Sequence, residues 1–325
     1  MIYLISRWEH AYTTESPRIA CEGFHFLSYD RLLEARELPR ATYIFTDIDR
    51  LSVYELELAS IVFRELAAGG ARVMNDPAAV LTRYDLLRAL HREGINDFNA
   101  YRPQSGEWPD RYPVFLRRNA FHQGVLSELL HSREALEMAL KETLEQGIPH
   151  ANTIAVEYAA EPTGGENVFR KFAVYRIGDR YFQDTTVNQK GWVVKGGEVG
   201  VAGEEFYQEE CAGIDTVPDA ATVERVFEIA RIEYGRVDFG KFQGRPQFYE
   251  VNTNPTVRFL TEHPSPARRQ SRRTFVNNYR QAIGEIGFAG ARETIVIKSL
   301  VLAKLRRKFH PREHWFRPYR SRPSF

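Results

Sequence analysis

The stretch Tyr234–Pro255 carries polar side chains whose types and spacing are suited to metal chemistry. It predicts two strands, Arg236–Lys241 and Pro246–Val251, joined by a tight turn around Gly244. Side chains two residues apart share one face of a strand, so the polar residues of each strand project together. The pattern therefore predicts a hairpin with one chemically active face.

The active face of this hairpin contains two carboxylates and an amide. Arg236 and Asp238 share a face of the first strand. Glu250 and Asn252 share a face of the second. A hairpin folded about its turn places Asp238 opposite Glu250, where like charges repel unless a divalent cation lies between them. Carboxylate and amide oxygens suit Mg²⁺, with Mn²⁺ as the alternative ion, bound together with nucleotide phosphates. The alternative interpretation is a solvated hairpin that carries its charges on a wet face.

Length and composition bound the class of protein. With 325 residues and 43% hydrophobic content, the chain is long enough for two or more domains. Its two cysteines, Cys21 and Cys211, lack CxxC spacing, which fits a reducing compartment and opposes a disulfide scaffold. The N-terminus predicts a strand and not a signal peptide, and no run of about 18 apolar residues predicts a membrane span. We expect a cytoplasmic protein with no nucleic-acid partner, because base-reading motifs are absent.

The net charge of +1 conceals an asymmetry between the body of the chain and its C-terminal tail. Residues 292–325 contain ten Lys or Arg against two Glu, which leaves 34 basic and 41 acidic residues in the body. The tail therefore carries about +8 and the body about −7. We expect a basic amphipathic helix at Glu293–Lys308, followed by an end rich in Pro, Arg and aromatics. Such a tail contacts an acidic surface, mediates a homodimer or stays solvated.

Strand–helix–strand alternation predicts a small parallel α/β domain at residues 1–76. Apolar runs predict strands at Ile2–Ser6, Ala41–Phe45 and Ala71–Met74, and helical spacing predicts a helix at Ser52–Ala68. Ligands of such sheets bind beyond the carboxyl ends of the strands. The residues at these ends are candidates for a substrate pocket, with loop polars and a helix cap as the alternative: Arg7, Trp8, Asp47 and Asp49.

The rest of the chain mixes helices and strands. A cap and a proline at Asn75–Pro77 predict a helix that runs to Arg92. Further predicted strands are Pro113–Arg118, Thr153–Tyr158, Val168–Ile177 and Tyr181–Val187, and further helices are Glu134–Glu145, Ala220–Glu233 and Arg273–Ile286. Five glycines predict a mobile loop at Lys190–Gly203. The sequence His310–His314 matches HxxEH, a zinc-protease motif. We reject this match because Pro311 opposes the helix that the motif needs.

The order of these motifs resembles the ATP-grasp superfamily, in particular D-alanine–D-alanine ligase and the glutathione-synthetase-like ligases. The resemblance covers roughly residues 75–290, and RVDF followed by EVNTNP is its most specific part. It implies an α/β fold (α+β ATP-grasp) with a small parallel α/β domain at 1–76 in front. Two α+β subdomains, 77–157 and 158–290, would clasp ATP, and a basic helix and tail would follow at 291–325.

The resemblance assigns roles to charged residues. The family's Mg²⁺ ligands match Asp238, Glu250 and Asn252. Arg236 matches the arginine that steadies the transferring phosphoryl group. Arg83 and Arg117 stand where the family has phosphate-contacting lysines, and both keep the charge while adding a fork geometry suited to phosphate oxygens.

The resemblance also implies a nucleotide hinge at Val156–Ala160, where backbone groups bind adenine. Its members are Glu157, Tyr158 and Ala160. Glu161 or Glu166 matches the acid that binds the ribose hydroxyls. Lys171 stands near the position expected for that acid and is a candidate phosphate contact.

Two loops match the family's flexible flaps. Asn119–Gly124 replaces a glycine- and serine-rich flap, with His122 as a phosphate donor or plain surface. Lys190 or Lys195 supplies the catalytic lysine of the second flap, and we favour Lys190. After the hairpin, three residues are candidates for reading the acceptor, with a surface loop as the alternative: Arg258, Glu262 and His263.

The implied activity is an ATP-dependent carboxylate–amine ligase. A carboxylate attacks the γ-phosphate of ATP, and an amine captures the acyl phosphate. The substrates would be small-molecule or peptide carboxylates and amines. The alternatives are an ATP-grasp kinase that phosphorylates a small-molecule hydroxyl and a non-catalytic nucleotide-binding protein.

Overall fold

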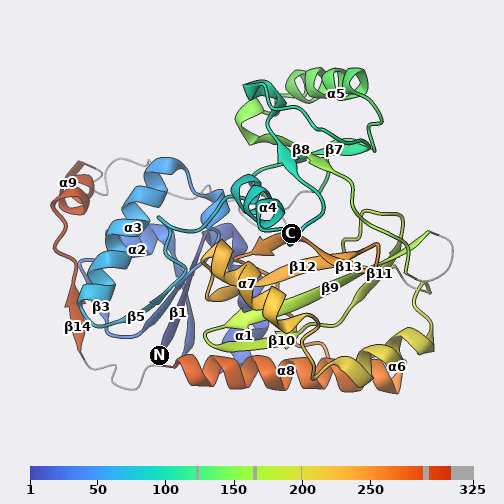
Figure 1. Cartoon of the computed structure of the whole chain (residues 1–325). Helices are drawn as coiled ribbons and strands as arrows, with labels where there is room; N and C mark the ends of the chain where they lie inside the picture. The colour runs from blue at the N-terminus through green and yellow to red at the C-terminus, as the bar shows by residue number, and fades with distance from the viewer. Residues whose placement is uncertain (122–123, 164–166, 199, 288–292, 309–325) are drawn as a thin grey trace, which may run out of the picture. The chain divides into compact units, whose positions relative to one another are not determined.

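The computed structural model describes residues 1–121, 124–163, 167–198, 200–287 and 293–308, with side chains of the last segment described as far as Lys304. The chain forms two compact units, each with its own sheets (Figure 1). Unit 1 contains Met1–Val80, Thr253–Phe259 and the described residues from Arg280 onward. Unit 2 contains Leu81–Asn252 and Leu260–Tyr279.

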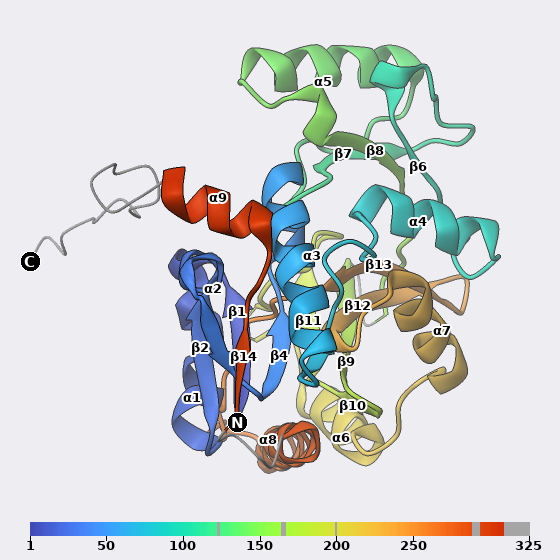
Figure 2. The same cartoon turned by 90° about the vertical axis from the view of Figure 1, so that its left-hand side faces the viewer.

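Unit 1 is built on a four-stranded parallel sheet with the order β2-β1-β4-β5. Its elements are β1 (Ile2–Ser6), a 3₁₀ helix η1 (Trp8–Thr14), α1 (Glu15–Ala20), β2 (Phe24–Ser28), α2 (Tyr29–Glu34), β3 (Glu37–Pro39), β4 (Thr42–Phe45), η2 (Ile48–Arg50), α3 (Val53–Ala68), β5 (Arg72–Met74), β14 (Thr294–Val296) and α9 (Leu300–Lys308). Helices α2 and α3 pack beside the sheet and against each other (Figure 2). The predicted parallel α/β layer is confirmed.

Helix α3 begins where the sequence predicts. Ser52 caps it: the Ser52 Oγ accepts from the Glu55 amide at 3.2 Å, and the Glu55 carboxylate accepts from the Ser52 amide at 2.7 Å. This reciprocal capping box satisfies two amide groups that a helix start leaves without partners. The local sequence therefore fixes the position of this helix.

The prediction of a helix at Glu293–Lys308 is wrong in its first half. Strand β14 pairs antiparallel with β3, and α9 starts only afterwards. Ile295 and Leu302 are buried in the core of unit 1. A Cβ on Gly69 would lie 2.5 Å from the Ile295 side chain, so the end of α3 accommodates this strand only with glycine. β-Branched residues and an available partner strand outweigh the helical spacing.

The helix predicted from Asn75–Pro77 to Arg92 starts later than expected. Helix α4 (Arg83–Arg92) begins after Thr82, whose Oγ1 accepts from the Asp85 amide at 3.3 Å. Asn75 is buried in a left-handed conformation (φ 61°), and its side chain donates to the Phe45 carbonyl at 3.0 Å. This tertiary hydrogen bond holds a turn where local capping signals favour a helix.

Unit 2 contains two antiparallel sheets, ordered β6-β8-β7 and β10-β9-β12-β13, with β11 paired to β9. Its elements are α4, β6 (Ala100–Tyr101), η3 (Pro103–Ser105), β7 (Val114–Arg118), α5 (Arg133–Glu145), η4 (His150–Asn152), β8 (Thr153–Glu157), β9 (Val168–Ile177), β10 (Arg180–Gln183), β11 (Val187–Lys190), α6 (Glu204–Gly213), α7 (Ala220–Ala230), β12 (Tyr234–Phe242) and β13 (Arg245–Asn252). Helix α8 (Pro266–Ile286) starts in unit 2, seven residues before its predicted start. The predicted strand Tyr181–Val187 is divided between β10 and β11.

The β12–β13 hairpin brings its carboxylates together through a β-bulge. Its two-residue turn, Gln243 and Gly244, has positive φ at both positions. An uninterrupted register from this turn would pair Asp238 with Tyr249. A register shift beside Asp238 makes Tyr249 the extra residue, so Asp238 pairs with Glu250. The predicted facing carboxylates are therefore confirmed, although the bulge that produces them was not predicted.

Two absences apply to the described residues. Within them, no helix has both the length and the apolarity needed to cross a membrane. Cys21 and Cys211 are both free thiols. The expectation that the chain has no disulfide scaffold is consistent with this finding.

We expect Ile295→Ala to lower the free energy of unfolding by about 2–5 kcal/mol, because it removes buried methyl groups and leaves a cavity. Chemical denaturation followed by circular dichroism measures the change. Val296→Ala, in the same strand and 49% exposed, is the matched control and should cost less than about 0.5 kcal/mol. Equal losses in the two variants would contradict the docking of β14.

Candidate functional site

A cavity of about 330 Å³ lies within unit 2. A charged group of side chains lines one part of it: Arg117, Lys171, Arg236, Asp238 and Glu250, together with Asn252. An apolar group lines another part: Leu87, Phe98, Phe115, Val156, Phe169, Trp192 and Tyr249. Of the twelve predicted site residues, the structure describes all but Glu166. Nine of these eleven line this cavity, and Arg83 and Lys190 do not. The structure therefore brings most of the predicted site residues to one cavity, while their roles stay predictions.

Asp238 is buried and carries two cationic partners. Arg236 donates to both of its carboxylate oxygens, at 2.6 and 3.0 Å, and the Lys171 ammonium lies 2.9 Å away. Burial raises the pKa of Asp238, but Arg236 and Lys171 outweigh it and leave the pKa below its ordinary value. Lys171, on β9, thus pairs with the carboxylate of Asp238 on the neighbouring strand β12, and its role toward a nucleotide stays a prediction.

Glu250 has the same arrangement with two arginines. Its Oε2 accepts from Arg83 at 2.7 Å and from Arg117 at 2.9 Å. Burial, together with the neighbouring Arg83, lowers the pKa of Arg117 to about 10. Arg83 does not line the cavity itself but reaches it through Glu250.

Arg83 also contacts the loop after β7. Its Nη1 donates to the carbonyls of Asn119 and Phe121 at 3.1 and 3.3 Å, while its Nη2 binds Glu250. A guanidinium fork serves both groups at once, which a single ammonium with a compact charge does less well. Arg83 therefore ties α4 to the loop after β7 as well as to the hairpin.

A third carboxylate lies beside this cluster. Asp184 is 3.7 Å from Arg236, and burial raises its pKa. In this arrangement each facing carboxylate of the hairpin contacts two cations. A divalent ion bound by the carboxylates would release those cations toward an anionic ligand, because one positive charge replaces another. The cluster is suited to a metal–polyphosphate complex.

The predicted hinge lines the cavity, but the Glu157 side chain is engaged elsewhere. The buried Glu157 carboxylate accepts from the Asn99 amide at 3.0 Å, the Tyr101 hydroxyl at 3.0 Å and Arg111 at 2.8 Å. Tyr158, Ala159 and Ala160 follow along the cavity wall. Glu157 therefore fixes the path of the hinge, and the binding of a nucleobase by its backbone stays a prediction.

The two ribose candidates have different outcomes. The Glu161 carboxylate accepts from the amides of Gln243 and Gly244 at 2.7 and 3.2 Å, which caps the hairpin turn. Glu161 also lines the cavity. Glu166 lies outside the described residues. The assignment of a ribose acid stays a prediction.

The second loop presents Lys195 and not Lys190 to the cavity. Lys190 is exposed at the end of β11 and does not line the cavity, whereas Lys195 does. The Lys195 ammonium lies against Gly124, where a Cβ would come within 2.6 Å of it. Gly124 has φ +89°, a backbone conformation that favours glycine, whereas the flexible end of the Lys195 side chain can move away from an added Cβ. The preference for Lys190 gains no support from this geometry. In the first loop, His122 lies outside the described residues.

The predicted acceptor-reading residues divide between the units. Arg258 is exposed in unit 1, and Glu262 is exposed in unit 2. His263, also in unit 2, packs edge-on against Tyr207 at 4.8 Å between centroids, and burial followed by Arg272 lowers its pKa. Their role in binding an acceptor stays a prediction.

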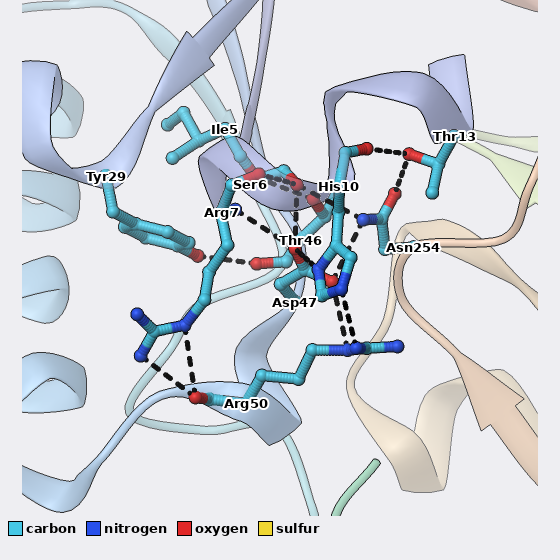
Figure 3. Close-up of polar contacts among 10 residues, drawn as sticks. All are labelled: Ile5, Ser6, Arg7, His10, Thr13, Tyr29, Thr46, Asp47, Arg50 and Asn254. Carbon is cyan, nitrogen blue, oxygen red and sulfur yellow. Dashed lines mark hydrogen bonds and ion pairs between the residues drawn. The ribbon is translucent and has the colours of Figure 1, made fainter. Parts of the chain in front are cut away.

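A second polar cluster lies in unit 1 where β1 and β4 end (Figure 3). The fully buried Asp47 accepts from the Ser6 hydroxyl at 2.7 Å, the Arg7 amide at 3.0 Å, His10 Nδ1 at 2.8 Å and Asn254 Nδ2 at 2.9 Å. Burial raises the pKa of Asp47, but the hydrogen bonds from His10, Ser6 and Asn254 outweigh it and lower the pKa.

Further hydrogen bonds connect the members of this cluster to one another. Arg50 can only donate, so its 2.8 Å contact fixes His10 Nε2 as an acceptor and leaves the proton on Nδ1, facing Asp47. Thr13 donates to the Asn254 carbonyl oxygen at 2.9 Å. The network therefore holds the segment after β13 to the ends of β1 and β4, which indicates that the cluster stabilises the fold of unit 1.

The candidates predicted beside Asp47 differ in their contacts and in how exposed they are to solvent. Arg7 forms a two-pronged ion pair with Glu55, with both oxygens at 2.8 Å. Trp8 is 60% exposed, and Asp49 lies within η2. A substrate pocket at these residues stays a prediction.

Sequence reasoning missed several residues of the cavity, among them Tyr249 and Trp192. Tyr249, the extra residue of the bulge, lines the cavity and donates to the Ala159 carbonyl at 3.1 Å. Trp192 comes from the glycine-rich loop and packs against Phe115 and Tyr158. The apolar run Trp192–Val194 inside a polar loop was the available signal.

Comparison with known proteins relates this chain to others through its fold. No protein-family model matches the sequence. No curated protein matches it either. The structure is similar to D-alanine–D-alanine ligase from Bacillus anthracis complexed with ATP, at 14% identity over 94% of this chain and 98% of that chain, with a TM-score of 0.51. It is also similar to a RimK domain protein ATP-grasp from Sphaerobacter thermophilus DSM 20745, at 16% identity over 89% and 99%, with a TM-score of 0.49.

We expect Asp47→Asn to lower the free energy of unfolding by about 1–3 kcal/mol at pH 7, because buried donors lose a charged acceptor. The lowered pKa of Asp47 stabilises the fold above its ordinary value of 3.8, and this contribution is lost as the pH falls below it. The gap between variant and wild type should therefore shrink below about pH 4, measured by denaturation at several pH values. Asp179→Asn, at an exposed turn, is the control. A gap that stays constant down to pH 3 would contradict this account.

Proposed function

Because the chain has the ATP-grasp fold, we propose that it is an ATP-dependent ligase that joins a carboxylate to an amine. The observation that carries the proposal is the pairing of Asp238 with Glu250 across the β12–β13 ladder, each carboxylate held by two cations at the wall of a partly apolar cavity. Such a cavity suits a ligand with a polyphosphate and a planar base. The fold alone does not select a reaction, so the site carries the argument.

The residues present fit a divalent cation. Asp238, Glu250 and Asn252 offer hard oxygen ligands from adjacent strands that line one cavity. We propose that they hold Mg²⁺, with Mn²⁺ as the alternative ion. When bound, the ion neutralises phosphate charge. The set has only two carboxylates, and the described residues contain no group of three or more His, Cys, Asp or Glu suited to a metal. Phosphate oxygens would therefore have to complete the coordination.

The cations around the hairpin are suited to the phosphates. Arg117 and Lys171 line the cavity, and Arg83 is linked to it through Glu250. We propose that these three side chains bind phosphate oxygens once a metal takes their place beside the carboxylates. Arg236, fixed beside Asp238, would stabilise the charge of the phosphoryl group in transfer.

The proposed reaction has two steps. A substrate carboxylate oxygen attacks the γ-phosphorus of ATP, and the bond to ADP breaks. The amine then attacks the acyl carbon, loses a proton, and inorganic phosphate leaves. The acyl phosphate must be kept from water. Lys195 and Gly124, from two different loops, lie in contact over the cavity and are suited to this closure.

A hydroxylamine trap tests the reaction class. We expect incubation with ATP, Mg²⁺, hydroxylamine and a panel of small and peptide carboxylic acids to yield ADP, phosphate and an acid hydroxamate. A stable phosphoester with ADP and no hydroxamate would instead identify a kinase. ATP binding without turnover over the whole panel would indicate a nucleotide-binding protein. Each of these two results overturns the ligase proposal.

We expect Glu250→Gln to reduce turnover by roughly 100-fold or more, because it removes a charge from the metal site without changing volume. It also leaves Arg83 and Arg117 without their shared carboxylate, so the melting temperature in the absence of nucleotide should fall. MgATP should reverse part of this decrease in melting temperature, because phosphates supply the missing negative charge. Glu137→Gln, at an exposed position of α5, is the control. Wild-type turnover in Glu250→Gln would rule out the metal assignment.

A further inference from the structure

Trp192 forms part of the apolar wall of the cavity. Its ring lies 4.8 Å from the Phe115 ring and 5.8 Å from the Tyr158 ring, measured between centroids, and the contact with Tyr158 is edge-on. All three residues line the cavity. Phe115 stands two residues before Arg117 on β7, and Tyr158 follows directly on β8. Trp192 therefore contacts β7 and the hinge residue that follows β8.

The loop that carries Trp192 is anchored at its base. The Gly191 amide donates to the Asn167 carbonyl at 2.9 Å, and the Glu198 amide donates to the Asn188 carbonyl at 3.0 Å. Gly191 has φ +83°, a conformation that favours glycine and turns the chain directly before Trp192. Three residues later the same loop presents Lys195 to the cavity. One anchored loop thus supplies an aromatic ring and a cation to the same space.

The two side chains are suited to different parts of one ligand. An aromatic ring that packs on other aromatics offers a face or edge to a planar base. A lysine is suited to phosphate oxygens. A loop with both groups would contact a nucleotide at its base and at its phosphates, whereas a loop with the lysine alone would respond to phosphates only.

We propose that Trp192 is a specificity-determining residue through which the second loop reads the nucleobase. This inference rests on the proposed binding of ATP and goes beyond it, because it makes loop closure depend on the base. Trp192 completes an aromatic wall with Phe115 and Tyr158, and Lys195 engages the phosphates from the same loop. Polyphosphate without a base would leave the Trp192 contact unused.

Calorimetric titration with ATP and with inorganic tripolyphosphate, both with Mg²⁺, separates the base from the phosphates. We expect Trp192→Ala to weaken ATP binding by about tenfold, because base–aromatic stacking is lost. Tripolyphosphate binding should change by less than about twofold. Trp192→Phe keeps an aromatic ring and should recover most of the ATP affinity. Trp108→Phe is the matched control, since Trp108 packs under Arg133 and is not among the residues that line the cavity.

Tryptophan fluorescence provides a second measurement on folded protein. ATP should change the emission of Trp108→Phe, which retains Trp192, and should change that of Trp192→Phe much less. Tripolyphosphate should have little effect on either.

The possible results separate this inference from the proposed function. ATP affinity of Trp192→Ala within about twofold of wild type, or an equal loss for tripolyphosphate, overturns the role of Trp192. Wild-type protein that binds neither ligand overturns both the role of Trp192 and the proposed function. A base-dependent loss in Trp192→Ala, together with a negative hydroxylamine trap, supports the role of Trp192 and rejects the ligase.

Discussion

Two carboxylates that face each other across a β-ladder depend on positive charge from elsewhere in the chain. Asp238 and Glu250 occupy paired positions on β12 and β13, and each contacts two cations. These cations come from four separate elements: the start of α4, the end of β7, the middle of β9 and β12 itself. Unit 2 brings these elements together around one charged cluster, and the cluster decides which anionic ligand the cavity suits.

Cationic side chains of the same chain pair with the facing carboxylates. Arg83 serves two groups with one side chain. Its guanidinium donates to backbone carbonyls of the loop after β7 and to a carboxylate of the hairpin at the same time. A buried charge without a partner is costly, so these ion pairs remove a penalty that the carboxylates would otherwise impose on the fold. The proposed binding of a metal and phosphates would require the same pairs to separate.

The sequence predicted the parts of the site that rest on local alternation. Asp238 and Glu250 could be placed on facing strands because a two-residue period and a glycine turn are visible without tertiary information. The start of α4 was missed because a buried Asn75 is held by a carbonyl far away in the chain. The strand β14 was missed because its partner, β3, lies near the opposite end of the sequence. Trp192 was missed because glycines around it predicted mobility, while its anchoring hydrogen bonds are long-range or irregular.

The extra residue at Tyr249 has a consequence for how this hairpin can diverge. Tyr249 is one residue more than an uninterrupted pairing of β12 with β13 would need. A chain without it would pair Asp238 directly with Glu250, so the two acids would still face each other. Such a chain would lose the side chain that lines the cavity and donates to the Ala159 carbonyl. The segment can therefore shorten by one residue at this position without separating the acids, and what the bulge adds to the site is the tyrosine.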